Sequence, residues 1–484
     1  MPASTLTATV NVTGYFCLYL AVAMLLPMAV DIGAGNEDWQ VFLLSSFLVA
    51  GIALAMIVMT HGYPMRFSPR FGFIVLNALW LSTSLVAALP LYFSSLDLTM
   101  ADAVFEAVSG ITTTGSTVLV GLDGLPPGLL LWRSVTHWLG GIGVVATGLL
   151  LLPFLNVGGM QIFKLESSSQ AESPFPRFRQ FSIALLSFYV AITFACTLAY
   201  SMAGMTLFEA VNHAMATIST GGFSTRDASF REFGEAALIV GIIFMLLGAM
   251  PFAVLIRAIV QRDIRSAYDP QVPVLLTIVG LSAFTVTVLA VEHLEVERWS
   301  VVIHAVFNVV SIITTTGFVS ADYDQWGPLS VGIFFLLTFL GGCAGSTVGG
   351  IKIYRLMVLF QTVRVNLRQM VRPDVVLPVR YGAQTVSSRV IQSVAVFVGI
   401  YLAIFLVAAV ALTATGLDFI TALSGAITAL SNVGPGFGTL IGPAGTFADV
   451  PETAKWILSG TMLLGRLEVM AVLILFSPSF WRHF

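Results

Sequence analysis

The most evident scarcity in this sequence is charge. Only 10% of its 484 residues are Asp, Glu, Lys or Arg, whereas a soluble globular domain carries about 25%. Hydrophobic residues make up 57% of the chain, and the mean hydropathy is +0.93. This composition indicates a membrane protein with several spans. The net charge of −3 gives no sign of nucleic-acid binding, and we expect none.

Cysteine and catalytic motifs are also scarce. The three cysteines, Cys17, Cys196 and Cys343, lie in apolar runs and offer neither a disulfide framework nor metal-ligand spacing. Residues 1–12 lack the Lys or Arg of a secretory signal peptide, so we expect the first apolar run to be a retained helix. No Ser-His-Asp, metal-ligand or nucleotide motif is present, so we expect no enzyme and no cofactor in this chain.

What the sequence does contain is long apolar runs. Ten of them approach the ~20 residues that cross a bilayer: 13–31, 40–60, 71–94, 129–153, 182–204, 236–260, 272–291, 329–351, 392–414 and 455–477. Four other apolar segments are too short to cross: 101–114, 206–221, 300–316 and 418–433. A re-entrant half-helix is the natural interpretation of each short segment.

Each short segment ends in a similar loop. Ser311–Phe318 reads Ser-Ile-Ile-Thr-Thr-Thr-Gly-Phe, and related sequences end at Gly115, Gly222 and Gly434. A single copy would indicate only a helix C-cap, because Gly accepts positive φ without strain. Four copies in one chain indicate four equivalent units.

These observations predict an all-α polytopic membrane protein. Four tandem units of span, half-helix, filter loop and span would surround one pseudo-fourfold axis, preceded by two extra N-terminal transmembrane helices. The predicted divisions are 1–69 for the extra helices, then 70–180, 181–270, 271–390 and 391–484 for the four pore repeats.

The distribution of charge predicts the orientation. Most Lys and Arg residues lie in the loops 61–70, 154–180, 261–271 and 352–391, while the opposite segments are acidic. The positive-inside rule then places both termini in the cytoplasm and all four Thr/Gly loops outside.

The loops have the composition of a monovalent-cation filter. A half-helix that stops inside the membrane carries about −0.5 charge at its C-terminal end, which favours a cation. An extended Thr-Gly backbone can offer rings of carbonyl oxygens in place of an ion's hydration shell. The loops contain no carboxylate, which a divalent-cation site would normally supply.

On these motifs the chain resembles the Trk/Ktr/HKT superfamily of potassium transporters, and most closely its TrkH-type subunits, over essentially its whole length. The resemblance implies that K⁺ is bound at a selectivity filter made of Thr113, Thr114, Gly115, Thr220, Gly221, Gly222, Thr315, Thr316, Gly317, Asn432, Val433 and Gly434. Asn432 and Val433 depart from the Thr pattern, so we expect fourfold symmetry to be approximate.

A second unusual stretch is Leu340–Gly350, which holds six glycines and cannot be a comfortable helix. A phosphate-binding loop is disfavoured because Gly-Lys-Ser/Thr does not follow. A plain kink and a broken helix with a mobile polar segment both stay open. The family resemblance implies a gate, with Gly345, Ser346, Thr347 and Gly349 as its residues.

Arg466 lies within the last apolar run. Charges inside a membrane are costly and usually face a cavity or a partner. One interpretation is a structural pair with Glu468 or a helix end; the family resemblance favours an electrostatic barrier beside the gate.

The half-helices also carry polar residues four positions apart. Counted back from the filter glycine, position −13 holds Asp102, Glu209, His304 and Thr421, and position −9 holds Glu106, His213, Asn308 and Gly425. They either anchor the half-helices by hydrogen bonds or take part in ion coordination or proton linkage.

The expected function is K⁺ uptake across the bacterial inner membrane. A less selective K⁺/Na⁺ system and a symporter coupled to H⁺ or Na⁺ are the alternatives, and a non-transport membrane anchor is disfavoured. The resemblance implies a homodimer in membrane lipid that binds a cytosolic nucleotide-binding ring of the TrkA type. The basic segment 352–391 is the expected docking surface, although the positive-inside rule alone also explains its charge.

Overall fold

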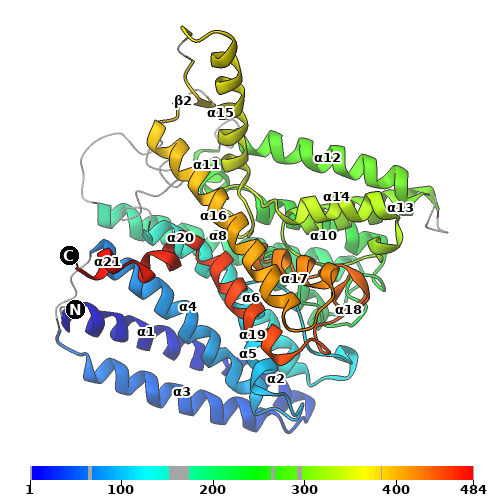
Figure 1. The fold of residues 1–484 in the computed structure, drawn as a ribbon. Helices are drawn as coiled ribbons and strands as arrows, with labels where there is room; N and C mark the ends of the chain where they lie inside the picture. Colours follow the sequence, from blue (N-terminus) through cyan, green and yellow to red (C-terminus); the bar gives the residue numbers. More distant parts are fainter. Residues whose placement is uncertain are drawn as a thin grey trace.

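The computed structural model describes residues 3–63, 68–151, 174–262, 268–291, 297–375, 377–382 and 384–482. Within these ranges the regular secondary structure is helical except for two strands of two residues each, as the predicted all-α fold requires (Figure 1). Six helices are long and apolar enough to cross a membrane, and up to eight if two sharply bent helix pairs each count as one span. Most of the predicted loop 154–180 lies outside the described residues, as do parts of the loops 61–70 and 261–271.

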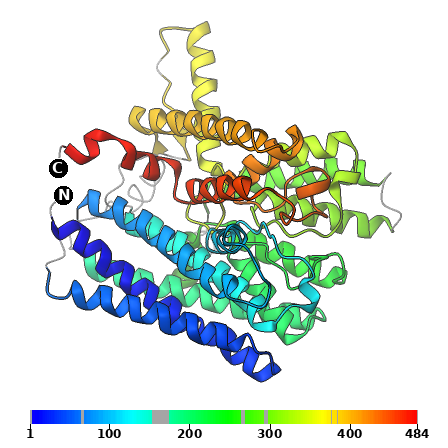
Figure 2. The same ribbon diagram turned by 60° about the horizontal axis from the view of Figure 1, so that its bottom comes forward.

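The N-terminal part forms a layer along one side of the molecule (Figures 1 and 2). It consists of α1 (Ala3–Ala23), α2 (Leu25–Ala34) and α3 (Trp39–Met59). The hydroxyl of Ser46 in α3 donates to the carbonyl of Ala21 in α1 at 2.7 Å. At the end of this layer, the buried carboxylate of Asp31 accepts from Gly128 N at 2.6 Å, which ties α2 to the first pore repeat.

The helices of the four predicted repeats follow in order. The first contains α4 (Pro69–Tyr92), α5 (Met100–Ile111), η1 (Leu122–Gly124) and α6 (Pro127–Leu151), and the second α8 (Pro174–Met202), α9 (Leu207–Ile218), α10 (Glu235–Ala249) and α11 (Phe252–Gln261). The third contains α12 (Gln271–Ala290), α13 (Arg298–Ile313), η3 (Tyr323–Gln325), α14 (Pro328–Thr338), α15 (Ile353–Val371), β1 (Arg380–Tyr381) and β2 (Gln384–Thr385). The fourth contains α16 (Ser388–Thr413), α17 (Phe419–Ser431), α18 (Gly438–Ile441), α19 (Glu452–Arg466), α20 (Val469–Leu473), η4 (Ile474–Phe476) and α21 (Pro478–Arg482).

The short helices α5, α9, α13 and α17 occupy the four predicted half-helix positions. The residues of their C-terminal halves are buried, except for Met215 and Val306, which are partly buried. Thr99 with Asp102, and Thr206 with Glu209, form capping boxes that begin α5 and α9, and Asp418 caps α17. Such caps satisfy backbone N–H groups that would otherwise be left without acceptors.

Two predicted continuous spans are wrong. The segment 236–260 bends by 94° between α10 and α11, and 455–477 bends by 106° after α19. The first bend follows from Pro251, which cannot continue the hydrogen-bond ladder of α10. The second falls at Glu468, whose φ is +58°. In the third repeat the helix ends at Thr338, as the predicted broken helix requires.

Helix α15 leaves the rest of the molecule as an arm, and the chain returns beside it to β1 (Figures 1 and 2). Tyr354 and Val358 at the base of the arm pack with Tyr381. The two termini lie near each other at one end of the molecule (Figure 1).

Candidate functional site: the four filter loops and the segment beneath them

All four Thr/Gly loops share one backbone conformation. In each, the glycine and the residue two positions before it have positive φ: Thr113 and Gly115, Thr220 and Gly222, Thr315 and Gly317, and Asn432 and Gly434. A β-branched Thr at positive φ is strained, so three of the loops hold a conformation that only the surrounding structure can maintain. Strained backbone of this kind clusters at functional sites, which makes the four loops the candidate site.

The turn that begins each loop is also repeated. The N–H group just before the filter glycine donates to the carbonyl six residues before that glycine, and the four bonds are Thr114 to Ser109, Gly221 to Ala216, Thr316 to Ser311 and Val433 to Thr428, at 2.8, 2.8, 2.8 and 3.0 Å. The loops are therefore four copies of one structure despite their different side chains.

The four loops contact one another in a closed ring. A methyl group at Gly115 would overlap the carbonyl oxygen of Gly221, one at Gly222 would overlap that of Thr316, and one at Gly317 would overlap that of Val433. A methyl group at Gly434 would lie 2.9 Å from the carbonyl oxygen of Thr114, the atom nearest to it. Each glycine thus faces the next loop in chain order, and the fourth faces the first.

The polar residues at position −9 of the half-helices form hydrogen bonds to the chain just after each filter glycine. Glu106 accepts from Val118 N at 2.9 Å, and Asn308 accepts from Ser320 N at 3.1 Å. His213 is hydrogen-bonded to Ser224 at 2.9 Å. At Gly425 the neighbouring Ser424 takes over and accepts from Phe437 N at 3.0 Å. These bonds favour the anchoring interpretation of the polar positions.

A buried ion pair reinforces the first half-helix. Arg133 of α6 donates to Glu106 at 2.8 Å, and both side chains are almost inaccessible to solvent. Arg133 also donates to the carbonyl of Ser224 and lies over the Phe223 ring. It connects the first repeat to the second. The sequence analysis missed it, although an Arg within an apolar run is the same signal that identified Arg466.

Replacing Arg133 by Met should destabilise the protein by about 3–5 kcal/mol, because Glu106 would be left buried without its partner. The thermal midpoint measured by size-exclusion chromatography after heating would show the loss. Arg298→Met is the control, since Arg298 is exposed and a surface change of this kind costs about 0.5 kcal/mol or less. Equal midpoints for the two variants would contradict the role of the pair.

The outer loops that follow the filter form a second ring. Hydrogen bonds join each pair of neighbouring repeats, among them those from Gly121 N to Asp227, Phe230 N to Val319 O, Gly438 N to Asp324 and Phe447 N to Thr117 O. Burial raises the pKa of the Asp324 carboxyl to about 6, so the charge in its link to Gly438 is lost as the pH falls through that value.

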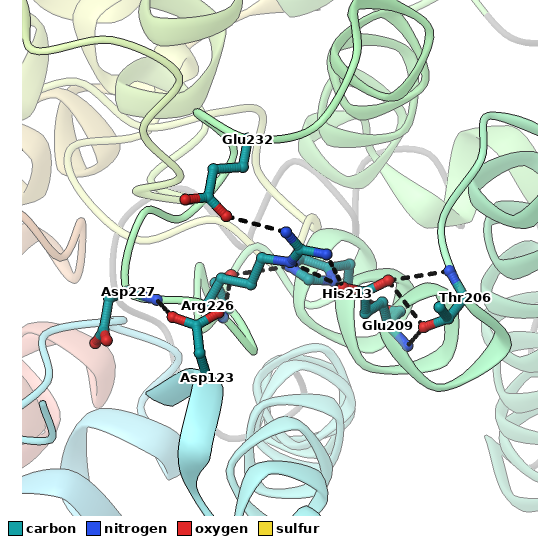
Figure 3. Close-up of polar contacts among 8 residues, drawn as sticks. Asp123, Thr206, Glu209, His213, Arg226, Asp227 and Glu232 are labelled. Atoms are coloured by element: carbon teal, nitrogen blue, oxygen red, sulfur yellow. Dashed lines mark hydrogen bonds and ion pairs between the residues drawn. The ribbon is translucent and has the colours of Figure 1, made fainter. Parts of the chain in front are cut away.

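At the second repeat this outer ring includes a charged cluster (Figure 3). Arg226 donates to Glu209 at 2.8 and 2.6 Å and to Glu232 at 3.0 Å. Glu209, a predicted position −13 residue, is also the capping residue of α9. The cluster fixes the start of the half-helix relative to the loop after the filter.

The Gly-rich segment of the third repeat lies directly against the filter loops. It is a loop closed at its neck by backbone bonds from Gly341 N to Ile351 O and from Ile351 N to Phe339 O. Thr347 accepts from Thr220 at 3.2 Å and donates to Ile218 O at 3.1 Å. Gly349 N donates to Thr315 at 2.8 Å.

The other predicted gate residues, Gly345, Ser346 and Gly349, also make contacts in the Gly-rich segment, and one of these contacts reaches the bend between α10 and α11. A side chain at Gly349 would overlap the carbonyl of Ser431. The hydroxyl of Ser346 donates to Cys343 O at 2.6 Å, within the segment. Gly345 has φ of +79°, and its carbonyl accepts from Phe252 N at 3.0 Å. The segment therefore contacts three of the four filter loops and the first residue of α11.

Arg466 is buried, and in the part of the chain that the structure describes none of its three guanidinium nitrogens has a hydrogen-bond partner. The suggested structural pair with Glu468 is wrong, because Glu468 is paired with Arg355, at the start of α15. This unpaired cation follows Gly465, which packs against Leu430 and Asn432 of the fourth Thr/Gly loop. The ion pair of Arg355 with Glu468 joins the broken last span to the helix that follows the Gly-rich segment.

Four half-helices whose loops meet in one ring define a polytopic membrane protein of four fused pore units. The family model for TrkH, described as a cation transport protein, matches residues 41–483. The Trk system potassium uptake protein TrkI of Halomonas elongata is 41% identical over 468 residues, 96% of this chain and 95% of that protein. The corresponding TrkH of Escherichia coli is 34% identical over 487 residues, covering 98% and 99%.

A solved structure agrees with these sequence matches. The crystal structure of the potassium transporter TrkH from Vibrio parahaemolyticus superimposes with a TM-score of 0.91 at 31% identity, covering 99% of this chain and all of that one. The chain belongs to the TrkH family of cation transport proteins.

Proposed function

We propose that this protein takes up K⁺ across the bacterial inner membrane through the ring formed by the four Thr/Gly loops. The observation that carries the proposal is the repeated backbone conformation of the loops, closed by contacts between each glycine and the next loop. The relatives are named as potassium uptake proteins, which supports K⁺ as the transported ion.

The chemistry of the ring suits a monovalent cation. Left-handed and ordinary backbone conformations alternate along each loop, which turns successive carbonyl groups toward the same side. The half-helix ends add a negative potential at the same place. No group of three or more His, Cys, Asp or Glu residues that could hold a metal occurs among the described residues. Carbonyl and hydroxyl oxygens would thus be the ion ligands.

The ion would be controlled by the Gly-rich segment and Arg466. The segment is hydrogen-bonded to the filter loops through Thr347 and Gly349, and Arg466 offers an uncompensated positive charge. Movement of the segment relative to Arg466 would open or close the path. Because the segment leads directly into α15, a partner bound to the arm could drive this movement.

Growth tests the function. Expression in a bacterium that lacks its own potassium-uptake systems should restore growth at low external K⁺, and Rb⁺ uptake by the same cells should rise. Failure of both, with the protein present in the inner membrane, would contradict the proposal.

We also propose that the protein is a homodimer with both termini in the cytoplasm and that it binds a cytosolic nucleotide-binding ring. The arm supports a partner surface: α15 exposes the apolar side chains of Phe360, Val363, Leu367, Met370 and Val371. Its basic residues Arg364 and Arg368 are exposed on the same helix. The positive-inside rule alone would explain the basic residues but not the exposed apolar ones, so the two together support a surface that binds a partner protein.

Reversing the charge at Arg364 and Arg368 to Glu should abolish co-purification of a co-expressed nucleotide-binding ring of the TrkA type, while basal Rb⁺ flux stays. Arg262→Glu, an exposed change at the end of α11, is the matched control and should leave co-purification intact. If the double variant still binds the ring fully, the basic residues of the arm serve only to orient the chain in the membrane and do not dock the partner.

A further inference from the structure

One junction of the filter ring differs from the other three. At Gly115, Gly222 and Gly317 an added methyl group would overlap the neighbouring loop outright, but at Gly434 it would lie 2.9 Å from Thr114 O. The backbone at Gly434 is also turned differently, with φ of +114° against +82° to +86° at the other three glycines, so the fourth and first loops meet in a different geometry. These loops belong to the repeats that are furthest apart along the chain.

Two side-chain hydrogen bonds cross this fourth junction. Asn432 Nδ2 donates to Thr114 Oγ1 at 2.9 Å, and Ser116 Oγ donates to the carbonyl of Gly434 at 2.8 Å. Among the described residues, the corresponding loop segments 112–116, 219–223, 314–318 and 431–435 have no such side-chain bond at the other three junctions. Backbone atoms approach one another at all four junctions, and within these loop segments side-chain hydrogen bonds join the loops at the fourth junction alone.

The residues that make these bonds differ from their equivalents. Asn432 stands at the left-handed position that Thr113, Thr220 and Thr315 occupy in the other loops. Ser116 stands after the filter glycine, where the other loops have Phe223, Phe318 and Pro435. Asn is also among the non-glycine residues best suited to positive φ. The departure from the Thr pattern thus supplies a longer side chain with a donor at its tip.

The orientation of the Asn432 amide follows from its partners. Its nitrogen also donates to Met462 O at 3.0 Å, and a backbone carbonyl can only accept. The two N–H groups of the amide therefore donate to different partners, one to Met462 in α19 and one to Thr114 in the first filter loop. Asn432 holds the first loop at a distance fixed by α19.

We propose that Asn432 and Ser116 form a clasp that sets the spacing between the fourth and first filter loops and thereby the preference for K⁺ over Na⁺. They act as positioning residues, through Thr114 and Gly434. The inference rests on the proposed function of the ring. Its physical basis is that selectivity depends on the spacing and field strength of the carbonyl oxygens around the ion.

A matched pair of variants isolates the clasp. Thr114→Val keeps the shape of the side chain but removes the acceptor for Asn432. Thr316→Val makes the same change in the third loop. Thr114 and Thr316 each share a bond with the Thr two residues earlier, at 2.7 and 2.8 Å, but no filter-loop side chain from a neighbouring repeat reaches Thr316. The difference between the two variants therefore measures the bond across the junction.

The measurement is the ratio of K⁺ to Na⁺ flux in proteoliposomes containing the full chain. Thr114→Val should lower the ratio about fivefold more than Thr316→Val does, the effect of losing one hydrogen bond. Ser116→Ala should lower it by a similar factor, and Ser116→Thr, which retains the hydroxyl, should restore it. A change in protein stability alone would alter the amount of active protein but not this ratio.

Equal ratios for Thr114→Val and Thr316→Val would overturn the clasp, as would equal ratios for Ser116→Ala and Ser116→Thr. The Ser116 pair decides the question if Thr114→Val does not assemble. Gly317→Ser separates this failure from that of the proposed function. If it lowers the ratio while the clasp variants do not, the filter stands without the clasp; if it too has no effect, the filter is wrong.

Discussion

Gly317→Ser should lower the K⁺/Na⁺ flux ratio of the protein by about tenfold to a hundredfold. A side chain at this position has no room, because it would overlap the carbonyl oxygen of Val433 in the next loop. The backbone φ of +82° adds strain for any residue but glycine. The loop must shift by enough to cost about 1–3 kcal/mol, and each 1.4 kcal/mol corresponds to about tenfold in selectivity.

Two further variants calibrate this result. Gly434→Ser should have a smaller effect, since the nearest carbonyl is further away there. Gly280→Ala should leave the ratio unchanged, because a methyl group at that position in α12 meets nothing within 4 Å. If both serine variants assemble and keep the K⁺/Na⁺ flux ratio of the unaltered protein, the four loops do not form the selectivity filter.

Arg466→Met should raise the flux of the isolated protein by up to roughly a thousandfold. A positive charge about 4 Å from a cation path opposes the ion by about 4 kcal/mol at an effective dielectric constant near 20. Removing that barrier accelerates permeation by the corresponding factor. The protein should fold normally, because Arg466 has no hydrogen-bond partner among the described residues that its loss would leave unpaired.

Rb⁺ uptake into proteoliposomes measures this effect. Thr347→Val should also raise the flux, though less, because it frees the Gly-rich segment from Ile218 and Thr220. Arg262→Met at the exposed end of α11 removes an equal charge away from the ring and serves as the control. If Arg466→Met leaves flux unchanged or lowers it while the protein assembles, the barrier lies elsewhere.

Repetition in the sequence is what made the fold predictable. The four copies of the Thr/Gly loop gave the positions of the half-helices, and the glycines at their ends all have positive φ. The interruption of the third closing span was visible because a cluster of glycines cannot sustain a helix. Each of these inferences depends on a local property of the chain.

Features that depend on contacts between distant residues could not be predicted in the same way. The pairing of Arg355 with Glu468 joins positions 113 residues apart, and nothing near either residue indicates the other. The bend after α10 was not predicted, although Pro251 could have indicated it, whereas the bend at Glu468 has no such marker. The hydrogen bonds from Asn432 and Ser116 across the fourth junction join positions 318 residues apart and are visible only in the folded chain.

The most direct test of the central claim is to locate the bound ion. Crystals of the protein grown in Rb⁺ or Tl⁺ should show anomalous density surrounded by the backbone carbonyls of all four loops, between Gly115, Gly222, Gly317 and Gly434. Replacement by Na⁺ should weaken that density. Anomalous density confined to carboxylates of the outer loops, with none inside the ring, would contradict the account.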